Sequence, residues 1–447
     1  MATSKLALLG GPKAVQSDAG DMFTWPIITQ EDEDAVLEVL RRGAMSDLDV
    51  TQEFEREFAA WHGMDYAVAH SSGTAALQAA MWACGVGVGD EIIGPSLTYW
   101  ASVLPAFSLG ASIVFAEVEP HSLCLDPHDI EHRITEHTKA IIPVHYCGYP
   151  ADMDPIMGIA ERHGVKVIED VSHAHGARYK GRLVGSIGHC NAMSTMAGKA
   201  LAIGEGGFAI TNDRLLYERL IAWGHYERTG AACQHPSLKP FAGLPWGGYK
   251  YRMHQLSSAC GRVQLRHYQA RMEEILRSMH YFWDLLEGVP GLRAHRPRKD
   301  SGSHCGGWYA PHGLYVPEDL GGLPVSRFCE AVAAEGTSTY PGANFPLHTH
   351  PLFHEADIYG HGKPTAIANA DRDLRQPKGS LPVTESLPER CYGIPWFKHY
   401  RPAIIEEHAN AFRKVAENAD AVREHSAEAA PAGPSGSAGR AGLFQRS

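Results

Sequence analysis

The sequence predicts an α/β protein with a mostly parallel β-sheet that is covered by helices on both faces. Between Tyr66 and Thr211, short apolar segments rich in strand-forming residues alternate with segments of helical length. Such alternation is typical of strand–helix–strand units around a parallel sheet. A second observation is the proline-free stretch from Gln255 to Gly288, whose apolar residues recur at near-helical spacing. We expect this long helix to carry the chain into a smaller C-terminal α+β domain.

The expected elements follow in chain order. Strands of the large domain are expected at Tyr66–Ala69, Glu91–Gly94, Ser112–Ala116, Ala140–Val144, Lys166–Glu169 and Phe208–Thr211. A helix at Ala75–Cys84 follows the first strand, and the long helix has Gly288 available as its stop. The smaller domain is expected to contain a strand near Trp308–Val316 and helices near Val325–Glu335 and Ile404–Ala421.

These elements divide the chain into four parts. An N-terminal segment covers residues 1–24, the large domain covers residues 25–260, and the small domain covers residues 261–425. Residues 426–447 are rich in Ala, Gly, Pro and Ser, a composition that does not support a packed core. We expect this last part to be a disordered tail that takes no part in chemistry.

The composition excludes several classes of protein. The chain has 447 residues, of which 44% are hydrophobic and 20% charged, as in ordinary globular proteins. Its net charge of -11 and the lack of a basic run argue against nucleic-acid binding. No apolar run is long enough for a membrane span, and Leu6–Leu9 is too short for a secretory core, so we expect a cytoplasmic location without membrane attachment. The nine Cys form no Cys-x-x-Cys pair, which predicts reduced thiols in the core.

An acid and a lysine stand where a cofactor could use both. The apolar segment that begins at Val165 ends in Glu169-Asp170, and strands of an open α/β sheet present their carboxyl ends at the ligand crevice. Lys199 lies among small and apolar residues, which favour a neutral, nucleophilic amine. Pyridoxal phosphate needs a carboxylate against its ring nitrogen and a lysine for a Schiff base with its aldehyde. Taken singly, each residue also fits a solvated charge.

A turn before the first helix is suited to a phosphate. His70-Ser71-Ser72-Gly73-Thr74 opens the helix at Ala75–Cys84, where free backbone N–H groups and a hydroxyl converge. A plain N-cap by Ser72 or Thr74 explains the same residues.

Taken together, these patterns resemble the DegT/DnrJ/EryC1/StrS family of aminotransferases. The resemblance extends from about Trp25 to about Val422 and is carried by Glu169-Asp170, His173-Ala174-His175-Gly176-Ala177, Ser194, Lys199 and Gly204-Glu205-Gly206-Gly207. It implies the fold type I of pyridoxal-phosphate enzymes, with pyridoxal 5'-phosphate as cofactor. It also implies transfer of an amino group from L-glutamate or L-glutamine to a keto sugar, often nucleotide-linked, or to a keto cyclitol.

The resemblance assigns roles to particular residues. Lys199 would form the Schiff base and act as general base, and Asp170 would hold the ring nitrogen protonated. The residue expected near the ring hydroxyl is His173, which otherwise is a buried imidazole. The phosphate would be held by Gly73, Thr74 and Ser194. Tyr99 aligns with the aromatic residue that stacks on the ring, and Trp100 beside it is a competitor.

One further segment matches a loop that closes the family's site, and another lies near the carboxyl end of the chain. His348 and His350 lie where relatives place a loop over the sugar or the amino donor, so we expect them to bind substrate. With His354 they could instead bind a metal, but no acidic or thiolate companion is obvious nearby, and no metal is expected. The segment Ile394–His399 could also reach the site, or form an exposed loop.

One position departs from the family pattern. The segment that begins at Gly248 aligns with a Gly-x-Asn-Tyr-Arg-Met sequence, whose asparagine reaches the cofactor phosphate of the neighbouring subunit. Lys250 stands in its place here. If the geometry is kept, an ammonium faces the phosphate, and the protein is a homodimer with shared active sites. Otherwise Lys250 is a solvated charge.

Other activities were weighed against this one. The deoxysugar dehydratases have the same fold but carry histidine in place of the Schiff-base lysine, and Lys199 counts against them. An enzyme similar to aminohydroxybenzoate synthase, or a cofactor-free binding protein with this fold, remains an alternative. A dinucleotide enzyme is disfavoured because the glycine-rich run Gly85–Asp90 precedes a strand instead of following one. The sequence identifies neither the acceptor ketone nor the donor.

Overall fold

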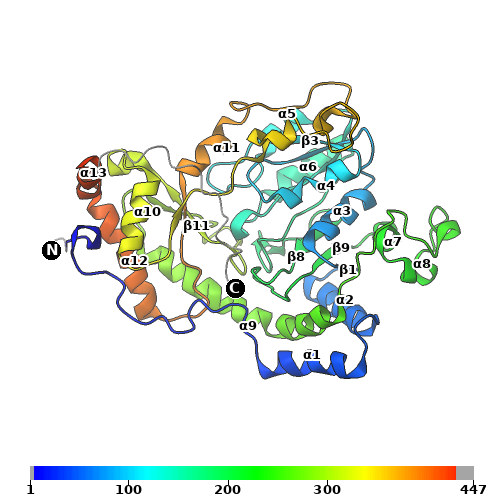
Figure 1. Cartoon of the computed structure of the whole chain (residues 1–447), viewed down its shortest axis with the longest axis horizontal. Helices are drawn as coiled ribbons and strands as arrows, with labels where there is room; N and C mark the ends of the chain where they lie inside the picture. The colour runs from blue at the N-terminus through cyan, green and yellow to red at the C-terminus, as the bar shows by residue number, and fades with distance from the viewer. Residues whose placement is uncertain (1–4, 429–447) are drawn as a thin grey trace.

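The computed structural model describes residues 5–428, and these form an α/β part and a smaller C-terminal part that are connected by one long helix (Figure 1). The predicted tail begins at Ser426, but residues 426–428 are still helical, and residues 429–447 lie outside the described range. The predicted boundaries at residues 24, 260 and 425 stay predictions.

The α/β part is built on a mostly parallel sheet, as the sequence predicted. Its strands are β1 (Tyr66–His70), β2 (Glu91–Pro95), β3 (Ser112–Ala116), β4 (Thr138–Ile141), β5 (Lys166–Val167), β8 (Asn191–Ser194) and β9 (Gly207–Thr211). The strands β3-β2-β4-β5 pair in parallel, whereas β9 is antiparallel to both β1 and β8. A parallel bridge between Asp170 and Ala192 joins the two groups. The carboxyl ends of β5 and β8 therefore lie side by side.

Helices cover both faces of this sheet. On one face, α3 (Gly73–Ala83), α4 (Pro105–Ser108) and α7 (Arg214–Gly224) share a hydrophobic core with the sheet. The opposite face packs against α2 (Asp49–His62), α5 (Pro127–Arg133), α6 (Met153–His163) and the long helix α9 (Gln255–Leu285). Because β2 and β3 are covered on both faces, every residue in them is buried.

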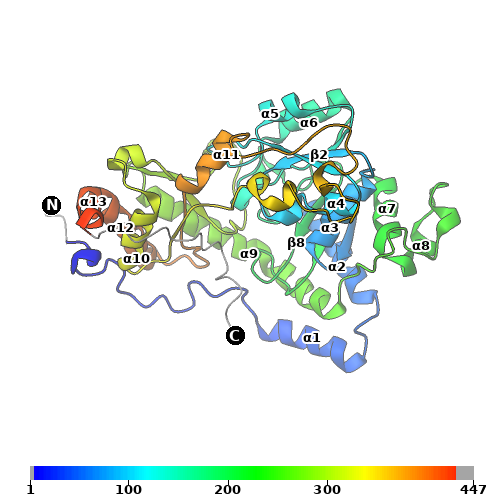
Figure 2. The same cartoon turned by 45° about the horizontal axis from the view of Figure 1, so that its top comes forward.

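The C-terminal part contains its own antiparallel sheet. Its strands β10 (Leu292–Ala294), β11 (His312–Tyr315), β12 (Tyr340–Pro341) and β13 (Cys391–Gly393) pair in the order β10-β11-β13-β12. They pack with α10 (Val325–Ala334), α12 (Pro402–Glu417) and α13 (Ala419–Glu428) around a third hydrophobic core. Figures 1 and 2 show α9 running from this part to the α/β part.

The N-terminal segment belongs with the C-terminal part. Leu6 and Met22 are buried in its core. The backbone N–H groups of Ala7 and Ala14 both donate to the carboxylate of Glu335, at 2.8 and 2.9 Å. The chain then crosses to α1 (Gln30–Arg42), which packs along α9.

Several elements differ from the sequence prediction. The helices α1 and α2 and the short hairpin of β6 (Arg178–Tyr179) and β7 (Arg182–Leu183) were not predicted. The strand expected at Ala140–Val144 begins earlier and ends at Ile141, because Pro143 has no N–H to donate to a ladder. The remaining α-helices of the described residues are the short α8 (Tyr226–Ala232) and α11 (Pro382–Ser386).

The cysteines and the helices of residues 5–428 bear on two predictions made from the composition. All nine cysteines are free thiols, and all but Cys260 are buried, as expected. None of the helices in this range combines the length and the apolar character that a membrane crossing requires.

Candidate active site

Asp170 is held in a fixed orientation at the end of β5. Its carboxylate is buried and accepts hydrogen bonds from Ser102 Oγ (2.7 Å, to Oδ2) and from the Ser172 N–H (3.0 Å, to Oδ1). Ser102 in turn bonds Thr98 Oγ1 at 2.8 Å. Neutral donors thus position both oxygens, which suits a carboxylate that must meet one atom of a ligand.

The neighbouring acid, Glu169, has a structural role. Its buried carboxylate bonds His145 Nε2 at 2.9 Å and accepts three backbone N–H groups, of Gly185, Ile187 and Gly188. Burial alone would raise the pKa of this carboxyl group, but the bond and charge of His145 and the backbone donors outweigh it and lower the pKa. Glu169 therefore ties the strand end that carries Asp170 to the segment after β7.

Lys199 lies in a closed loop between β8 and β9. Backbone bonds from Thr195 to Gly206 (2.9 Å) and from Ala197 to Gly204 (2.7 Å) bring the two ends of this loop together. The side chain is only 7% exposed, as expected from its apolar neighbours. Its Nζ lies 4.2 Å from the ring centroid of Tyr309.

The backbone carbonyl of Lys199 has a partner from the other end of the chain. The indole Nε1 of Trp25 donates to it at 2.8 Å. The N-terminal segment thus fixes the loop that presents the lysine, a contact that no sequence pattern indicated.

His173 is next to the same tyrosine. Its Nδ1 accepts the backbone N–H of Cys147 at 3.3 Å, and its ring centroid lies 4.8 Å from that of Tyr309. Tyr309 contacts both Lys199 and His173, and Asp170 is three residues before His173. The structure therefore places Lys199 and His173 around one aromatic ring, and convergence with Asp170 stays a prediction.

The predicted phosphate turn lies against the end of β8. Ser72 caps α3 by accepting the N–H of Ala75 at 3.1 Å. A Cβ on Gly73 would lie 2.5 Å from Ser194 Cβ and 2.7 Å from Ser194 Cα, so only glycine fits. The Ser194 N–H donates to Ser172 Oγ at 3.0 Å, which connects this turn to the Asp170 segment. A helix N-terminus and two serines therefore converge here.

A hollow of about 280 Å³ adjoins this turn. Its wall includes Thr74, Trp100 and Tyr251. Tyr99 and Trp100 are 46% and 41% exposed, and their rings are 4.9 Å apart. Both rings stand beside the turn, and the choice between them as the stacking residue stays open.

Lys250 is exposed near the start of α3. The carbonyl of the next residue, Tyr251, accepts the Ser71 N–H at 2.6 Å, which anchors this segment to the phosphate turn. Among the described residues, no carboxylate forms an ion pair with Lys250.

The two histidines predicted to bind substrate have different surroundings. His348 is buried, and its ring nitrogens bond Ser96 Oγ (2.7 Å) and Glu385 Oε1 (2.9 Å), which leaves neither nitrogen for a substrate. These contacts explain His348 as a structural residue and do not support the predicted role. His350 Nδ1 accepts the N–H of Leu352 at 3.1 Å, and its role stays a prediction. Within residues 5–428, no group of acidic, His or Cys side chains is arranged to hold a metal ion.

A second wall of the site comes from the C-terminal part. Trp396 donates from Nε1 to the Gly307 carbonyl at 3.1 Å, and its ring lies 5.9 Å from that of Tyr309. The Nζ of Lys398 lies 3.5 Å from the centroid of Trp396. Of the two interpretations of Ile394–His399, the structure therefore supports the one in which this segment reaches the site. Tyr309 was not predicted, because nothing in its sequence surroundings marks it.

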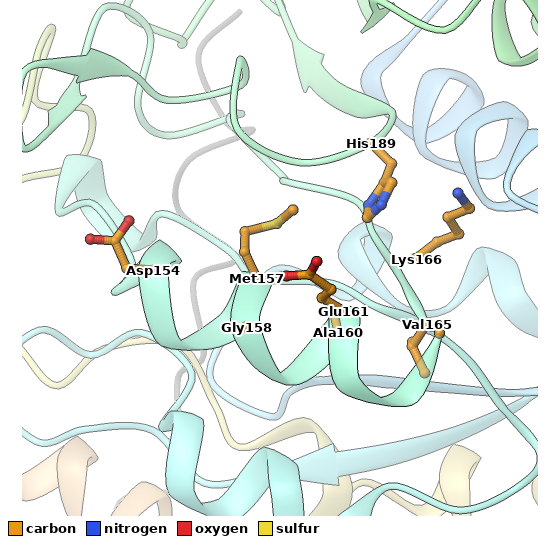
Figure 3. Close-up of a pocket in the computed structure, with 9 residues that line it drawn as sticks. Asp154, Met157, Gly158, Ala160, Glu161, Val165, Lys166 and His189 are labelled. Atoms are coloured by element: carbon orange, nitrogen blue, oxygen red, sulfur yellow. The ribbon is translucent and has the colours of Figure 1, made fainter.

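A larger hollow of about 530 Å³ lies elsewhere. Its wall is formed by α6 and the start of β5, with Asp154, Glu161, Lys166 and His189 (Figure 3). None of the predicted site residues lines it.

Comparison with known proteins decides the family. Residues 26–390 match the DegT/DnrJ/EryC1/StrS aminotransferase family. The chain belongs to this family. Membership confirms the family, the fold class and the aminotransferase assignment that the sequence predicted.

Individual members of the family are similar over most of their length. The chain is 35% identical over 417 residues to the L-glutamine:2-deoxy-scyllo-inosose aminotransferase of Streptoalloteichus tenebrarius, covering 90% of this chain and 94% of that protein. It is 34% identical over 382 residues to the spore coat polysaccharide biosynthesis protein SpsC of Bacillus subtilis, covering 82% and 92%. The solved aminotransferase from Psychrobacter cryohalolentis aligns with a TM-score of 0.78 and 29% identity, over 89% of this chain and 99% of that one.

Proposed function

We propose that this DegT-family aminotransferase uses pyridoxal 5'-phosphate to move an amino group from L-glutamine or L-glutamate to a keto cyclitol or a keto sugar. The observation that carries the proposal is a buried Lys199, whose loop is closed by backbone bonds and whose carbonyl accepts a bond from Trp25, together with a carboxylate at Asp170 whose orientation is fixed. The name of the Streptoalloteichus relative supports glutamine as donor and a keto cyclitol as acceptor.

The residues present fit the cofactor. Lys199 would bond its aldehyde, Asp170 its ring nitrogen, and the turn at Gly73 and Thr74 with Ser194 its phosphate. The close approach of Gly73 to Ser194 supports this, because it brings the N-terminus of α3 against this serine, and a Cβ on Gly73 would push the two apart. When bound, the cofactor supplies an electron sink for the carbanion that forms next to the transferred nitrogen.

The protein's own groups then handle protons and water. In the first half-reaction the Lys199 amine would remove the proton from the α-carbon of the donor, and in the second, which runs in reverse, it would deliver a proton to the carbon of the acceptor that receives the nitrogen, so that it acts as a general base and then as a general acid. Tyr309, packed at 4.2 Å from the amine, and the buried loop around it exclude water, which strengthens the electrostatic contribution of Asp170. His173 would form a hydrogen bond with the ring hydroxyl of the cofactor.

We further propose a homodimer in which Lys250 of one subunit contacts the phosphate bound by its partner. Lys250 is exposed and anchored next to the phosphate turn. The preceding residues present Phe241, Leu244 and Trp246 to solvent, and the α8 region projects from the α/β part (Figures 1 and 2). Exposed apolar side chains on a projection are typical of an interface.

The cytoplasmic location expected from the sequence also stays a prediction.

A visible absorption band of the purified protein is the first test. Covalent attachment of the cofactor to Lys199 predicts a yellow protein whose band disappears with borohydride. Keto inositols and nucleotide-linked keto sugars are then offered with either donor, and formation of an amine from one of them identifies the acceptor. A colourless protein that cofactor does not reconstitute would instead favour a binding protein, and loss of a sugar hydroxyl without amine formation a dehydratase.

A further inference from the structure

A buried amine in the second wall has no acidic partner. Lys398 follows β13 and is 5% exposed. Its Nζ donates one hydrogen bond, to the carbonyl of Trp396 at 3.0 Å. Among residues 5–428, no carboxylate pairs with it. A buried ammonium without a counter-ion is unfavourable, because it loses hydration without gaining an opposite charge.

Lys398 shares its aromatic neighbours with Lys199. Its Nζ lies 3.5 Å from the ring centroid of Trp396 and 5.9 Å from that of Trp25. Trp25 donates to the backbone of Lys199 at 2.8 Å, and Trp396 packs 5.9 Å from Tyr309, which contacts the Lys199 amine. Trp25 and Trp396 therefore pack against Lys398 and also contact the Lys199 loop, Trp25 directly and Trp396 through Tyr309.

The charged groups on the surrounding elements are already engaged. Glu274 of α9 accepts the N–H of Tyr400 at 3.0 Å and contacts His399 at 3.4 Å. Asp21 of the N-terminal segment pairs with Arg401. From α12, His408 packs its ring against Phe397 and bonds Thr337 at 2.5 Å. None of these groups pairs with Lys398, so an anionic ligand would supply the counter-ion that it lacks among the described residues.

We propose that Lys398 binds the α-carboxylate of the amino donor, a role that rests on the amino transfer proposed above. The reacting α-carbon must come within reach of the Lys199 amine, and the carboxylate is bonded directly to that carbon. A carboxylate supplies both the missing charge and acceptors for the two remaining N–H groups of Lys398, in a charge-assisted contact. The keto acceptor has no such group, so this contact selects the donor.

Donor binding is then linked to a proton. Burial lowers the pKa of Lys398 to about 6, so the amine is mostly neutral above that pH. A carboxylate beside it favours the ammonium and raises the pKa. Binding above about pH 6 therefore takes up a proton, and the affinity for the donor falls with rising pH until the raised pKa of the complex is passed.

The test compares two donors that differ only in the carboxylate. L-glutamine and L-glutaminol, in which an alcohol replaces the carboxylate, are reacted in single turnover with the holoenzyme, and the change of its visible band gives the apparent affinity and rate for each. The variants are Lys398→Met, which keeps the stem without the charge, and Lys398→Arg. Lys414→Met serves as a control, because the partly buried Lys414 already donates to the carboxylate of Glu335 and to the carbonyl of Pro12, away from Trp25 and Trp396.

The expected result is specific to glutamine. Lys398→Met should weaken the apparent affinity for L-glutamine by about 10- to 100-fold, the range of a hydrogen bond to a charged group, and leave L-glutaminol within about twofold. Lys398→Arg should recover part of the loss, and Lys414→Met should show none. Calorimetry with glutarate, which has no amine to react, should show proton uptake by the wild type and much less by Lys398→Met. Because Lys199 and His173 are unchanged, the difference isolates Lys398.

The outcomes separate this inference from the proposed function. If the wild type reacts with no amino donor, the amino transfer itself is wrong. If it transaminates but Lys398→Met keeps the preference for glutamine over glutaminol and the same proton uptake, the carboxylate contact is refuted. If Lys398→Met loses affinity equally for L-glutamine and L-glutaminol, Lys398 has a structural role. If it loses affinity only for a nucleotide-linked acceptor, Lys398 binds the phosphate of that acceptor.

Discussion

The two walls of the site are built in different ways. The cofactor wall consists of the ends of β5 and β8 and the start of α3, which the sheet and short backbone contacts hold together. The second wall consists of Trp25, Tyr309, Trp396 and Lys398, whose side chains come from three distant segments. The cofactor wall can therefore be recognised from short sequence motifs. The second wall cannot, because its side chains form no motif and meet only in the folded chain.

Their electrostatics differ as well. In the cofactor wall, Asp170 and Glu169 are bonded by donors of the protein itself. In the second wall, Lys398 is a buried amine without an acid among the described residues. The first wall is thus preorganised for a cofactor that stays bound. The second wall gains its counter-charge only when the amino donor binds. Variants in each wall should separate these two behaviours.

The largest effect is expected for Lys199→Ala. Removal of both the covalent partner and the general base should lower turnover by at least about 10³-fold. The fold should be kept, because the residue lies in a closed loop whose backbone bonds do not involve its side chain. Turnover is measured with a saturating donor, and thermal unfolding checks the fold. Cofactor should still bind without a covalent bond, and near-wild-type turnover would contradict the assignment.

Asp170→Asn should have the next largest effect. A neutral amide cannot hold the ring nitrogen protonated, so rates should fall by about 10²–10³-fold while the visible band persists. Because this change touches only the cofactor wall, both donors and acceptors should be affected alike. A fall of less than about tenfold, or about 1.4 kcal/mol, would exclude Asp170 as the partner of the ring.

Sequence reasoning found the cofactor wall because its residues lie in short segments with recognisable patterns. The structure packs the turn at Gly73 against Ser194 and places Lys199 and His173 around Tyr309. Ser102, which orients Asp170, was missed because a serine bonded across the sheet looks like any core serine. Trp25 and Tyr309 were missed because single aromatic residues carry no periodic signal.

The fold shows the same limit. The alternation of strands and helices predicted the parallel sheet, and the proline-free stretch predicted α9, because both are local patterns. The strand β8 was expected only from the family resemblance, and the bridge that joins the two halves of the sheet rests on one residue pair. Burial of His348 between Ser96 and Glu385 depends on packing between distant segments, so the sequence suggested a binding residue instead.

Lys250→Ala tests whether the cofactor wall extends across a dimer. If the ammonium contacts the phosphate, cofactor affinity should weaken by about 1.5–3 kcal/mol, as for a hydrogen bond to a charged group, and more so at low salt. Affinity is measured by titration of the apoprotein with cofactor at two salt concentrations.

Subunit mixing gives the sharper result for Lys250. Inactive Lys199→Ala protein mixed with Lys250→Ala protein should regain some activity, because each hybrid dimer carries one intact site. A monomer by light scattering, or no recovery after demonstrated subunit exchange, would remove Lys250 from the site and leave Lys199 and Asp170 unaffected.

The smallest effect is expected for Trp25→Phe, which breaks a side-chain hydrogen bond between the two walls. The Lys199 carbonyl loses the indole donor at 2.8 Å, while the ring is largely kept. The cost of one neutral hydrogen bond, about 0.5–1.5 kcal/mol, should lower turnover by less than about tenfold, equally for L-glutamine and L-glutaminol. Trp396→Phe is the matched control, because it removes an indole donor to Gly307 at 3.1 Å instead. If Trp25→Phe changes only glutamine kinetics, Trp25 acts through Lys398 and not through the Lys199 loop; if it changes nothing, the two walls are mechanically independent.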